Sequence, residues 1–505
     1  MESMLEALQG FFQGFEVAFT WWNILYCLVG VSVGMLVGVL PGLGPVFGTA
    51  ILIPLTYGLD PISAIIMLAG IYYGAMYGGT ITSVLVNIPG EVASVVTAID
   101  GHQMAKQGRA GTALGVAAIG SFIGGIVAMI AFVLLGPIVV KVALKFGPPE
   151  FFALMLFGLM MVVALVGKSL IKGLIAAILG MILAFIGEDL VSGTVRFTFG
   201  QLELLDGLDF TVLAIGLFGI SEVLIAMENM DTKTEILKVN KLFPEKEEWK
   251  PTLKAIARGT GIGVFLGLIP GASAAKSSLI SYLVERKAAK DPSRFGKGAI
   301  EGVAGPESAN NAHSGSAMIP LFMLGIPTSP TVAVLLGAFI IHGLQPGPKM
   351  FETNPDLIWG VIASMLIGNI ILLLFNLPLA KVWAMVAQVP LKLLLPLILI
   401  IALLGAYSVS QSLFDVGLAV FFGILGYFMR KLDIPVAPII LTFVLAREIE
   451  FRLAQSLIMS LDKGLLIFFQ RPISCVMMIL IFVILAINII GAIRKKPLLQ
   501  GGEPE

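Results

Sequence analysis

The chain carries one short stretch twice, and this stretch decides the fold. It reads Gly38-Val39-Leu40-Pro41-Gly42 in the first half and Gly267-Leu268-Ile269-Pro270-Gly271 in the second. In each copy a Pro-Gly pair interrupts an otherwise apolar segment. Proline removes a backbone N–H and glycine makes the backbone more flexible, so a continuous helix does not run through the pair. The sequence therefore predicts two related halves, each of which breaks a membrane segment at a Pro-Gly pair.

The composition fits a bilayer rather than water. Of the 505 residues, 57% are hydrophobic and 13% are charged, whereas soluble domains carry about 25% charged residues. The uncharged stretches 112–135, 357–377 and 472–490 are each long enough to cross a hydrocarbon core of ~30 Å. The formal net charge is zero, so no overall field recruits nucleic acid. We therefore expect a multi-pass membrane protein with no nucleic-acid partner.

The order of motifs in the first half recurs in the second. Asn87-Ile88-Pro89-Gly90 corresponds to Gly325-Ile326-Pro327-Thr328, and a Gly/Ser/Thr-rich run precedes each, at 78–80 and at 314–316. Such duplication is typical of transporters. The predicted divisions are an amphipathic lead-in (1–20), a first transmembrane repeat (21–227), a cytoplasmic linker (228–254), a second transmembrane repeat (255–471) and an extra C-terminal transmembrane helix with its tail (472–505).

Charge bias predicts that the two halves are inverted. The loop 103–111 carries two basic residues, whereas its counterpart 345–356 has one lysine and two acidic residues. The loop 285–297 is strongly basic, and its counterpart 57–61 has only Asp60 as a charged residue. Cytoplasmic loops collect Lys and Arg. The predicted fold is therefore an all-α polytopic membrane protein with two inverted repeats of about five spans each, interrupted helices, re-entrant hairpins and one further C-terminal span.

Broken helices at membrane depth point to a binding site. Unpaired backbone groups are costly in hydrocarbon, so breaks survive where protein or a wet cavity covers them. Each half has two: the Pro-Gly break and a more polar break that reads as a re-entrant hairpin. Helix N-termini at breaks suit a carboxylate, and side-chain and carbonyl oxygens suit Na⁺. Two alternatives stay open, a turn at the membrane edge for the Pro-Gly pairs and simple helix capping for the Ser, Thr and Asn side chains.

The candidate site residues come from these four breaks. Those predicted to bind substrate are Pro41, Gly42, Leu43, Gly44, Thr80, Thr82, Ser83, Asn87, Pro89, Gly90, Gly271, Ala272, Ser273, Lys276, Ser314, Ser316, Thr328 and Ser329. Those predicted to bind Na⁺ are Asn310, Asn311, Glu307, Ser308 and Asn87. Lys276 has a second interpretation, in which its ammonium group snorkels to the interface. No catalytic residue, metal site or ATPase motif is predicted, so transport would be secondary.

Three groups of residues resemble the TctA family, the large membrane subunit of bacterial tripartite tricarboxylate transporters. They are Pro41-Gly42-Leu43-Gly44-Pro45; residues 87–91 with 97–101 and 104–109; and residues 306–312. The resemblance implies Na⁺-dependent uptake of a citrate-like or other carboxylate across the bacterial inner membrane, with Na⁺ as coupling ion and no further cofactor. It also implies a periplasmic solute-binding protein and a small four-span membrane subunit as partners.

The second half departs from the family pattern. Ser273 stands where the family usually has glycine, and Thr328-Ser329 replaces the usual Gly-Ser. We therefore expect a second-half pocket shaped for an anion other than citrate. The leading hypothesis is a carboxylate importer that works by elevator-like alternating access. A passive anion channel is an alternative, and an intramembrane enzyme is a weaker one because no catalytic constellation is evident.

Overall fold

The structure is a computed structural model that describes residues 2–40, 42–166, 169–189, 192–228, 237, 239, 241–386 and 389–493. These residues are almost entirely helical. Strands β1 (Gly187–Glu188) and β2 (Val195–Arg196) form one short antiparallel hairpin. In the first half the helices are α1 (Glu2–Ala18), α2 (Trp21–Val39), α3 (Gly44–Leu52), α4 (Pro61–Val86), α5 (Val95–Met104), α6 (Ala110–Ala143), α7 (Pro148–Val166), α8 (Leu170–Ala184), α9 (Phe210–Ala214) and α10 (Ser221–Glu228).

The second half is described in the same way. Its helices are α11 (Trp249–Gly267), α12 (Ala274–Ala288), α13 (Glu301–Ser316), α14 (Met318–Leu324), α15 (Pro330–Ile341), α16 (Met350–Thr353), α17 (Pro355–Asn376), α18 (Ala380–Val386), α19 (Leu391–Ser410), α20 (Leu413–Lys431), α21 (Ala437–Ser460), α22 (Ile467–Gln470) and α23 (Pro472–Ile493). Short turns η1 (Ile53–Thr56) and η2 (Val92–Ser94) are 3₁₀-helical, and η3 (Ala105–Arg109) and η5 (Ile215–Ile220) are π-helical. The further short 3₁₀ turns are η4 (Leu202–Leu204), η6 (Lys246–Glu248), η7 (Pro292–Arg294) and η8 (Leu461–Leu466).

Eight helical segments among the described residues are long and apolar enough to cross a membrane, or nine if α22 and α23, bent by 95°, count as one span. The predicted all-α polytopic membrane fold is therefore confirmed. The inversion of the halves, the domain boundaries and the sidedness stay predictions. Part of the predicted linker, at 229–236, 238 and 240, and the tail 494–505 lie outside the described residues.

Both halves bring two backbones together through glycines spaced four residues apart. On α2 these are Gly30, Gly34 and Gly38, and a Cβ on Gly38 would lie 2.2 Å from the carbonyl oxygen of Ala75 on α4. The glycines of α11 repeat this against α13 at 259, 263 and 267. Small residues at such spacing let membrane helices approach closely. In both halves the last glycine of the row also begins the Gly-x-x-Pro-Gly break.

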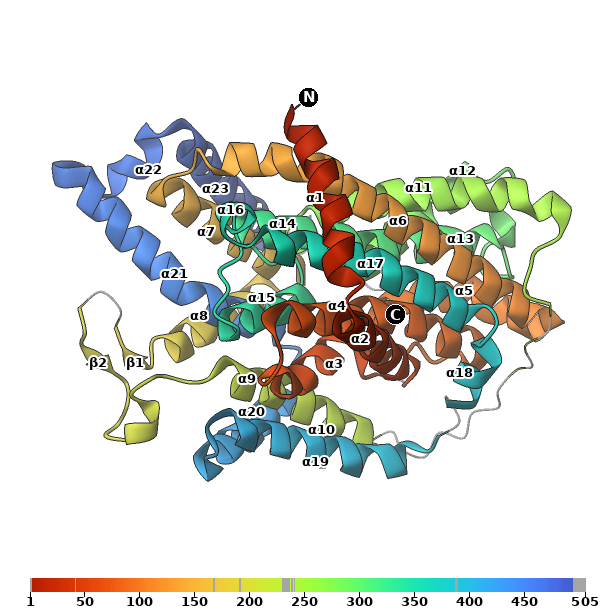
Figure 1. Ribbon diagram of the computed structural model, residues 1–505, viewed down its shortest axis with the longest axis horizontal. Coiled ribbons are helices and arrows are strands. Elements are labelled where there is room, and N and C mark those ends of the chain that lie inside the picture. Colours follow the sequence, from red (N-terminus) through yellow and green to blue (C-terminus); the bar gives the residue numbers. More distant parts are fainter. Residues whose placement is uncertain are drawn as a thin grey trace.

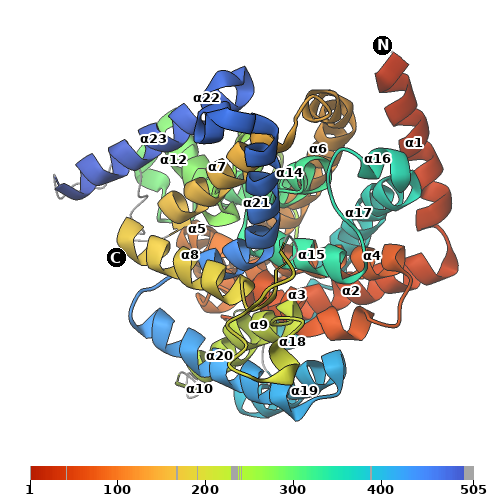
Figure 2. The same ribbon diagram turned by 90° about the vertical axis from the view of Figure 1, so that its left-hand side faces the viewer.

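The helices form three groups along the vertical axis of the figures. Figures 1 and 2 both show α9, α10, α19 and α20 at the bottom and α21 to α23 in the upper part, with α3, α4 and α15 between them. The long helix α6 runs along much of the longest axis of the molecule (Figure 1). The breaks that precede α3 and α15 therefore lie in the middle of the protein.

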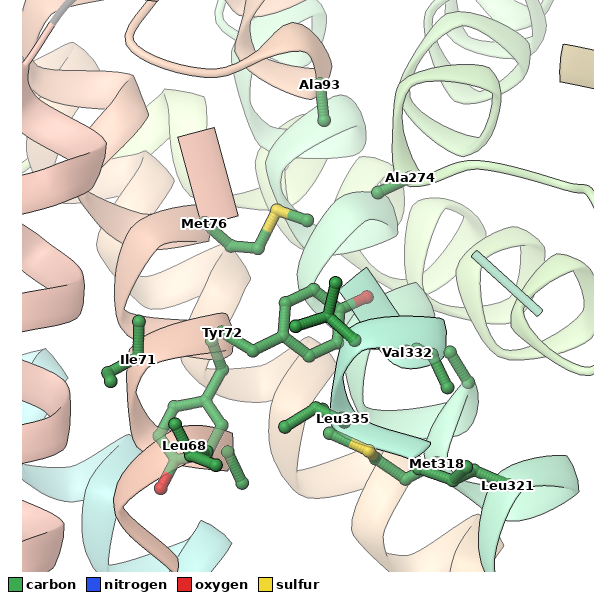
Figure 3. Packing of buried hydrophobic residues seen from close by; sticks show 14 of the residues in the cluster. Leu68, Ile71, Tyr72, Met76, Ala93, Ala274, Met318, Leu321, Val332 and Leu335 are labelled. Carbon is green, nitrogen blue, oxygen red and sulfur yellow. The ribbon is translucent and has the colours of Figure 1, made fainter. Parts of the chain in front are cut away.

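Helix α4 forms the centre of this middle group. Its 18-residue apolar window is completely buried. Figure 3 shows the Tyr72 side chain directed from α4 towards α15, with Val332 and Leu335 beside it and Ala274 of α12 nearby. The Tyr72 hydroxyl hydrogen-bonds to the side chain of Ser329. The two halves thus share one core, in which α4 of the first half packs against the broken segments of the second.

Candidate functional site

A cavity of about 520 Å³ lies where the four breaks meet. Residues 42–47 line it from the first break, 89–93 and Val95 from the second, 273–275 from the third and 329–331 from the fourth. Tyr72, Met76, Phe218, Glu222 and Arg430 complete the wall. Its volume falls in the range of small-molecule sites in proteins. The breaks that the sequence singled out therefore enclose one space.

Four helices begin at the wall of this cavity. They are α3 at Gly44, α12 at Ala274, α15 at Pro330 and, through the turn η2, α5. The first N–H groups of a helix have no partner within it, and together they carry about half a positive charge. Glu91, Ser273 and Ser329 cap three of these starts, whereas the start of α3 has no side-chain cap. The start of α3, apart from Pro45, which has no N–H, is thus the most available to an anion.

The backbone at the start of α3 requires glycine. Gly42 and Gly44 have φ angles of 83° and 57°, a region that L side chains rarely adopt. A Cβ on either residue would meet no atom within 4 Å, so the requirement is conformational rather than steric. These glycines turn the chain so that α3 begins at the cavity wall.

One ion pair lies at the cavity. Arg430 of α20 donates from Nη1 to Oε2 of Glu222 on α10. Among the described residues that line the cavity, Arg430 is the only basic one. A guanidinium recognises a carboxylate by charge and by its fork of N–H groups. The cavity therefore presents one such group, held by a carboxylate of the protein.

A polar cluster is buried in the core around Glu307, on α13. The Glu307 carboxylate accepts hydrogen bonds from Thr97 (2.5 Å) and Ser121 (3.5 Å). Asn311 donates to the Ser121 hydroxyl (2.7 Å) and to Oδ1 of Asn310 (2.5 Å), and the Asn310 side chain also interacts with Glu307. Three of the predicted Na⁺ ligands thus lie together, although Na⁺ binding itself stays a prediction.

The comparisons with known proteins agree with this architecture. The model of the "Tripartite tricarboxylate transporter TctA family" matches residues 24–441. The chain belongs to this family. It is therefore a membrane subunit of a tripartite transporter. A curated protein of Agrobacterium vitis, "Uncharacterized 52.8 kDa protein in TAR-I ttuC' 3'region", is 42% identical over 494 residues, 98% of each chain.

A second Agrobacterium vitis protein, "Uncharacterized protein in TAR-II ttuC' 3'region", is 42% identical over 234 residues, 46% of this chain and 96% of that protein. No solved structure matches this chain. The functional residues of this TctA-family chain are therefore argued from its own geometry.

Seven of the residues predicted to bind substrate line the cavity. They are Gly42, Leu43, Gly44, Pro89, Gly90, Ser273 and Ser329. Pro41 lies outside the described residues. Gly271 and Ala272 are buried behind the wall, and the Gly271 N–H donates to the carbonyl of Thr328 (2.8 Å), which ties the third break to the fourth.

The other predicted residues lie away from the cavity wall. Thr80, Thr82 and Ser83 are buried in α4, and Ser314 and Ser316 hydrogen-bond within their own helix α13. Lys276 donates from Nζ to the carbonyl of Leu165, near the end of α7. Asn87 is exposed and ends α4 with a φ of 58°. Ser308 bonds to the carbonyls of Gly305 and Ile256, away from Glu307.

Sequence reasoning missed several groups at this TctA site. Glu91 is 95% buried, lines the cavity and follows directly after Pro89-Gly90. A charged residue at a membrane break was the available signal. No local sequence signal marks Thr97, Ser121 and Arg430 as site residues, because their partners are about 200 residues away in sequence. Of the residues described, no three or more His, Cys, Asp and Glu gather in a group that could hold a metal ion.

Proposed function

We propose that this chain binds a small organic carboxylate in the cavity and carries it across the membrane as the large subunit of a tripartite transporter. The convergence of four helix N-termini from both halves on one cavity carries the proposal. Aligned N–H groups stabilise an anion without burying a fixed charge. Arg430, whose charge is balanced by Glu222, adds a guanidinium whose N–H groups could also bind a second carboxylate of the substrate.

Transport would be secondary and coupled to Na⁺. The buried Glu307, Asn310 and Asn311 offer carboxylate and amide oxygens, which hard cations prefer. The cavity lies between the broken segments and the group formed by α9, η5, α10, α19 and α20, from which Phe218, Glu222 and Arg430 line it. Displacement of the broken segments against this group would expose the cavity to either side of the membrane in an elevator-like cycle. A periplasmic solute-binding protein and a four-span subunit would act with the chain in the bacterial inner membrane.

The substrate class is a tricarboxylate, a dicarboxylate or a related anion. Ser273, where the chain departs from the family pattern, lines the cavity, and so do Ser329 and Pro330, which follow the departure at Thr328. Ser273 and Ser329 use their hydroxyls as helix caps. Specificity would therefore depend on the second-half breaks, as the sequence predicts.

The proposal is tested by uptake of radiolabelled citrate and malate into cells that express the chain with its partner subunits, with and without a Na⁺ gradient. The decisive variant is Ala274→Asp, because Ala274 lines the cavity at the first position of α12. A carboxylate there would occupy the N-terminus and repel the substrate. We expect uptake to fall by about tenfold or more.

Ala274→Asn is the matched control, since it has nearly the same size without the charge. We expect it to retain most of the uptake. Equal uptake by the aspartate and asparagine variants would contradict the anion site. Uptake that ignores the Na⁺ gradient and does not saturate would favour a passive channel.

A further inference from the structure

The carboxylate of Glu91, if ionised, is electrostatically unfavourable at the proposed anion site. Its side chain lines the same cavity as the four helix N-termini. One carboxylate oxygen, Oε2, accepts a hydrogen bond from the Ala93 N–H (2.7 Å). The other, Oε1, is buried and has no hydrogen-bond partner. An ionised carboxylate beside a bound anion repels it, and an unpaired buried charge is costly.

A second buried carboxylate increases this problem. Glu307 is close enough to Glu91 to repel it electrostatically. The partners of the two carboxylates are uncharged: the hydroxyls of Thr80, Thr97 and Ser121, the Asn310 side chain and backbone N–H groups. Within the described part of the chain, no Lys, Arg or His pairs with either one. The positive charge that would balance them is therefore expected to come from a bound ion.

Glu91 packs against α4 in a part of the core that contains several buried hydroxyl groups. Gly79 of α4 packs directly against it, since a Cβ on Gly79 would lie 2.6 Å from Cγ of Glu91. Thr80, the next residue, has a buried hydroxyl that interacts with the Glu307 side chain. The Ser94 hydroxyl donates to the Glu91 carbonyl (2.8 Å) and accepts from Ser83 (2.8 Å). Carboxylate and hydroxyl oxygens are the ligands that hard cations prefer.

We propose that Glu91 binds Na⁺ through Oε1 at the wall of the anion cavity, so that the ion neutralises the carboxylate that would otherwise repel the substrate. This rests on the proposed function and adds the residue at which ion and substrate binding are linked. Na⁺ and a proton would both neutralise this carboxylate, but only Na⁺ would make sodium binding depend on Glu91. Binding of either ligand would then favour binding of the other.

The test is binding of radioactive sodium to the purified full chain, measured by scintillation proximity without any carboxylate, with choline holding the ionic strength constant. We expect saturable binding by the wild type. Glu91→Gln should weaken it about tenfold or more, the size of effect typical of residues around a metal ion. Glu352→Gln removes an exposed carboxylate on α16 and should leave the affinity within about twofold.

A second variant keeps the carboxylate but moves it. Gly79→Ala places a methyl group against Glu91 and should also weaken sodium binding. Gel filtration verifies that each variant is folded. A carboxylate that the wild type takes up should raise the sodium affinity of the wild type and leave that of Glu91→Gln unchanged.

Wild-type sodium affinity in Glu91→Gln, or no saturable sodium binding by the wild type, would overturn this inference. Both results are independent of the uptake test above. Equal uptake by Ala274→Asp and Ala274→Asn would instead remove the anion site while sodium binding at Glu91 could persist, so the two failures are distinguishable.

Discussion

Replacement of one glycine in α11 tests the packing that holds the second-half break in place. A Cβ on Gly263 would lie 2.2 Å from the carbonyl oxygen of Ala309 and 2.8 Å from Cβ of Ala312, both on α13. Ordinary contact needs about 3.4 Å or more, so in Gly263→Ala the two helices must separate by about 1 Å. Overpacking of this kind costs about 1–3 kcal/mol, and α13 carries the Glu307 cluster.

Gly261→Ala is the matched control, two residues away on the same helix. A Cβ on Gly261 would meet no atom within 4 Å, and alanine is favoured over glycine inside a helix by about 1 kcal/mol. Because both variants gain this helix preference, we expect their free energies of unfolding to differ by the overpacking cost of about 1–3 kcal/mol, with Gly263→Ala the less stable. The assay is reversible unfolding of the purified protein in mixed micelles with increasing SDS. If Gly263→Ala unfolds at the same SDS fraction as Gly261→Ala, the close approach of α11 and α13 is wrong.

Three further changes test the site and its support. Arg430→Gln should weaken carboxylate binding by about tenfold or more, whereas Glu222→Gln, which frees the guanidinium, should strengthen it; equal affinities in competition binding would contradict a role for the pair. Asn310→Ala should abolish Na⁺-driven uptake while membrane insertion and purification stay normal, and unchanged uptake would remove this residue from the ion site. Asp100→Asn should lower the free energy of unfolding by about 3 kcal/mol, because this buried carboxylate accepts hydrogen bonds from three backbone N–H groups in 296–299 and from one tyrosine hydroxyl; an SDS midpoint equal to that of the wild type would contradict this.

Much of the fold follows from local sequence signals. The paired Pro-Gly breaks predict where α2 and α11 end, because their backbone requirements are local. Hydropathy does not predict α13 as a core element, since Glu301–Ser316 contains several polar residues. All 16 of its residues are nonetheless buried. Hydropathy scores a segment as if it faced lipid, whereas α13 is surrounded by protein that satisfies its polar groups.

The site is only partly predictable for a related reason. Helix starts at breaks are visible in sequence, so Gly44, Ser273 and Ser329 could be chosen as cavity residues in advance. Pairs such as Arg430 with Glu222 and Glu307 with Thr97 depend on tertiary packing between helices about 200 residues apart. The charge of Lys276 suggested a substrate ligand, but its ammonium group bonds to a helix carbonyl outside the cavity. Charge alone therefore does not identify the cavity residues. Residue type indicated the chemistry, but only packing decided which side chains meet.

Protection of one introduced thiol tests most directly that the cavity where the breaks meet binds a carboxylate. Ala275 lines this cavity, and an Ala275→Cys variant with serine at Cys27 and Cys475, the two native cysteines, carries a single reactive site. The measurement is the rate at which a small thiol reagent labels this cysteine in membranes, with Na⁺ and each of a panel of tri- and dicarboxylates. We expect at least one carboxylate that the cells take up to slow labelling in a saturable, Na⁺-dependent manner. If a carboxylate that the chain transports leaves the labelling rate unchanged at saturating concentration, the substrate does not bind in this cavity.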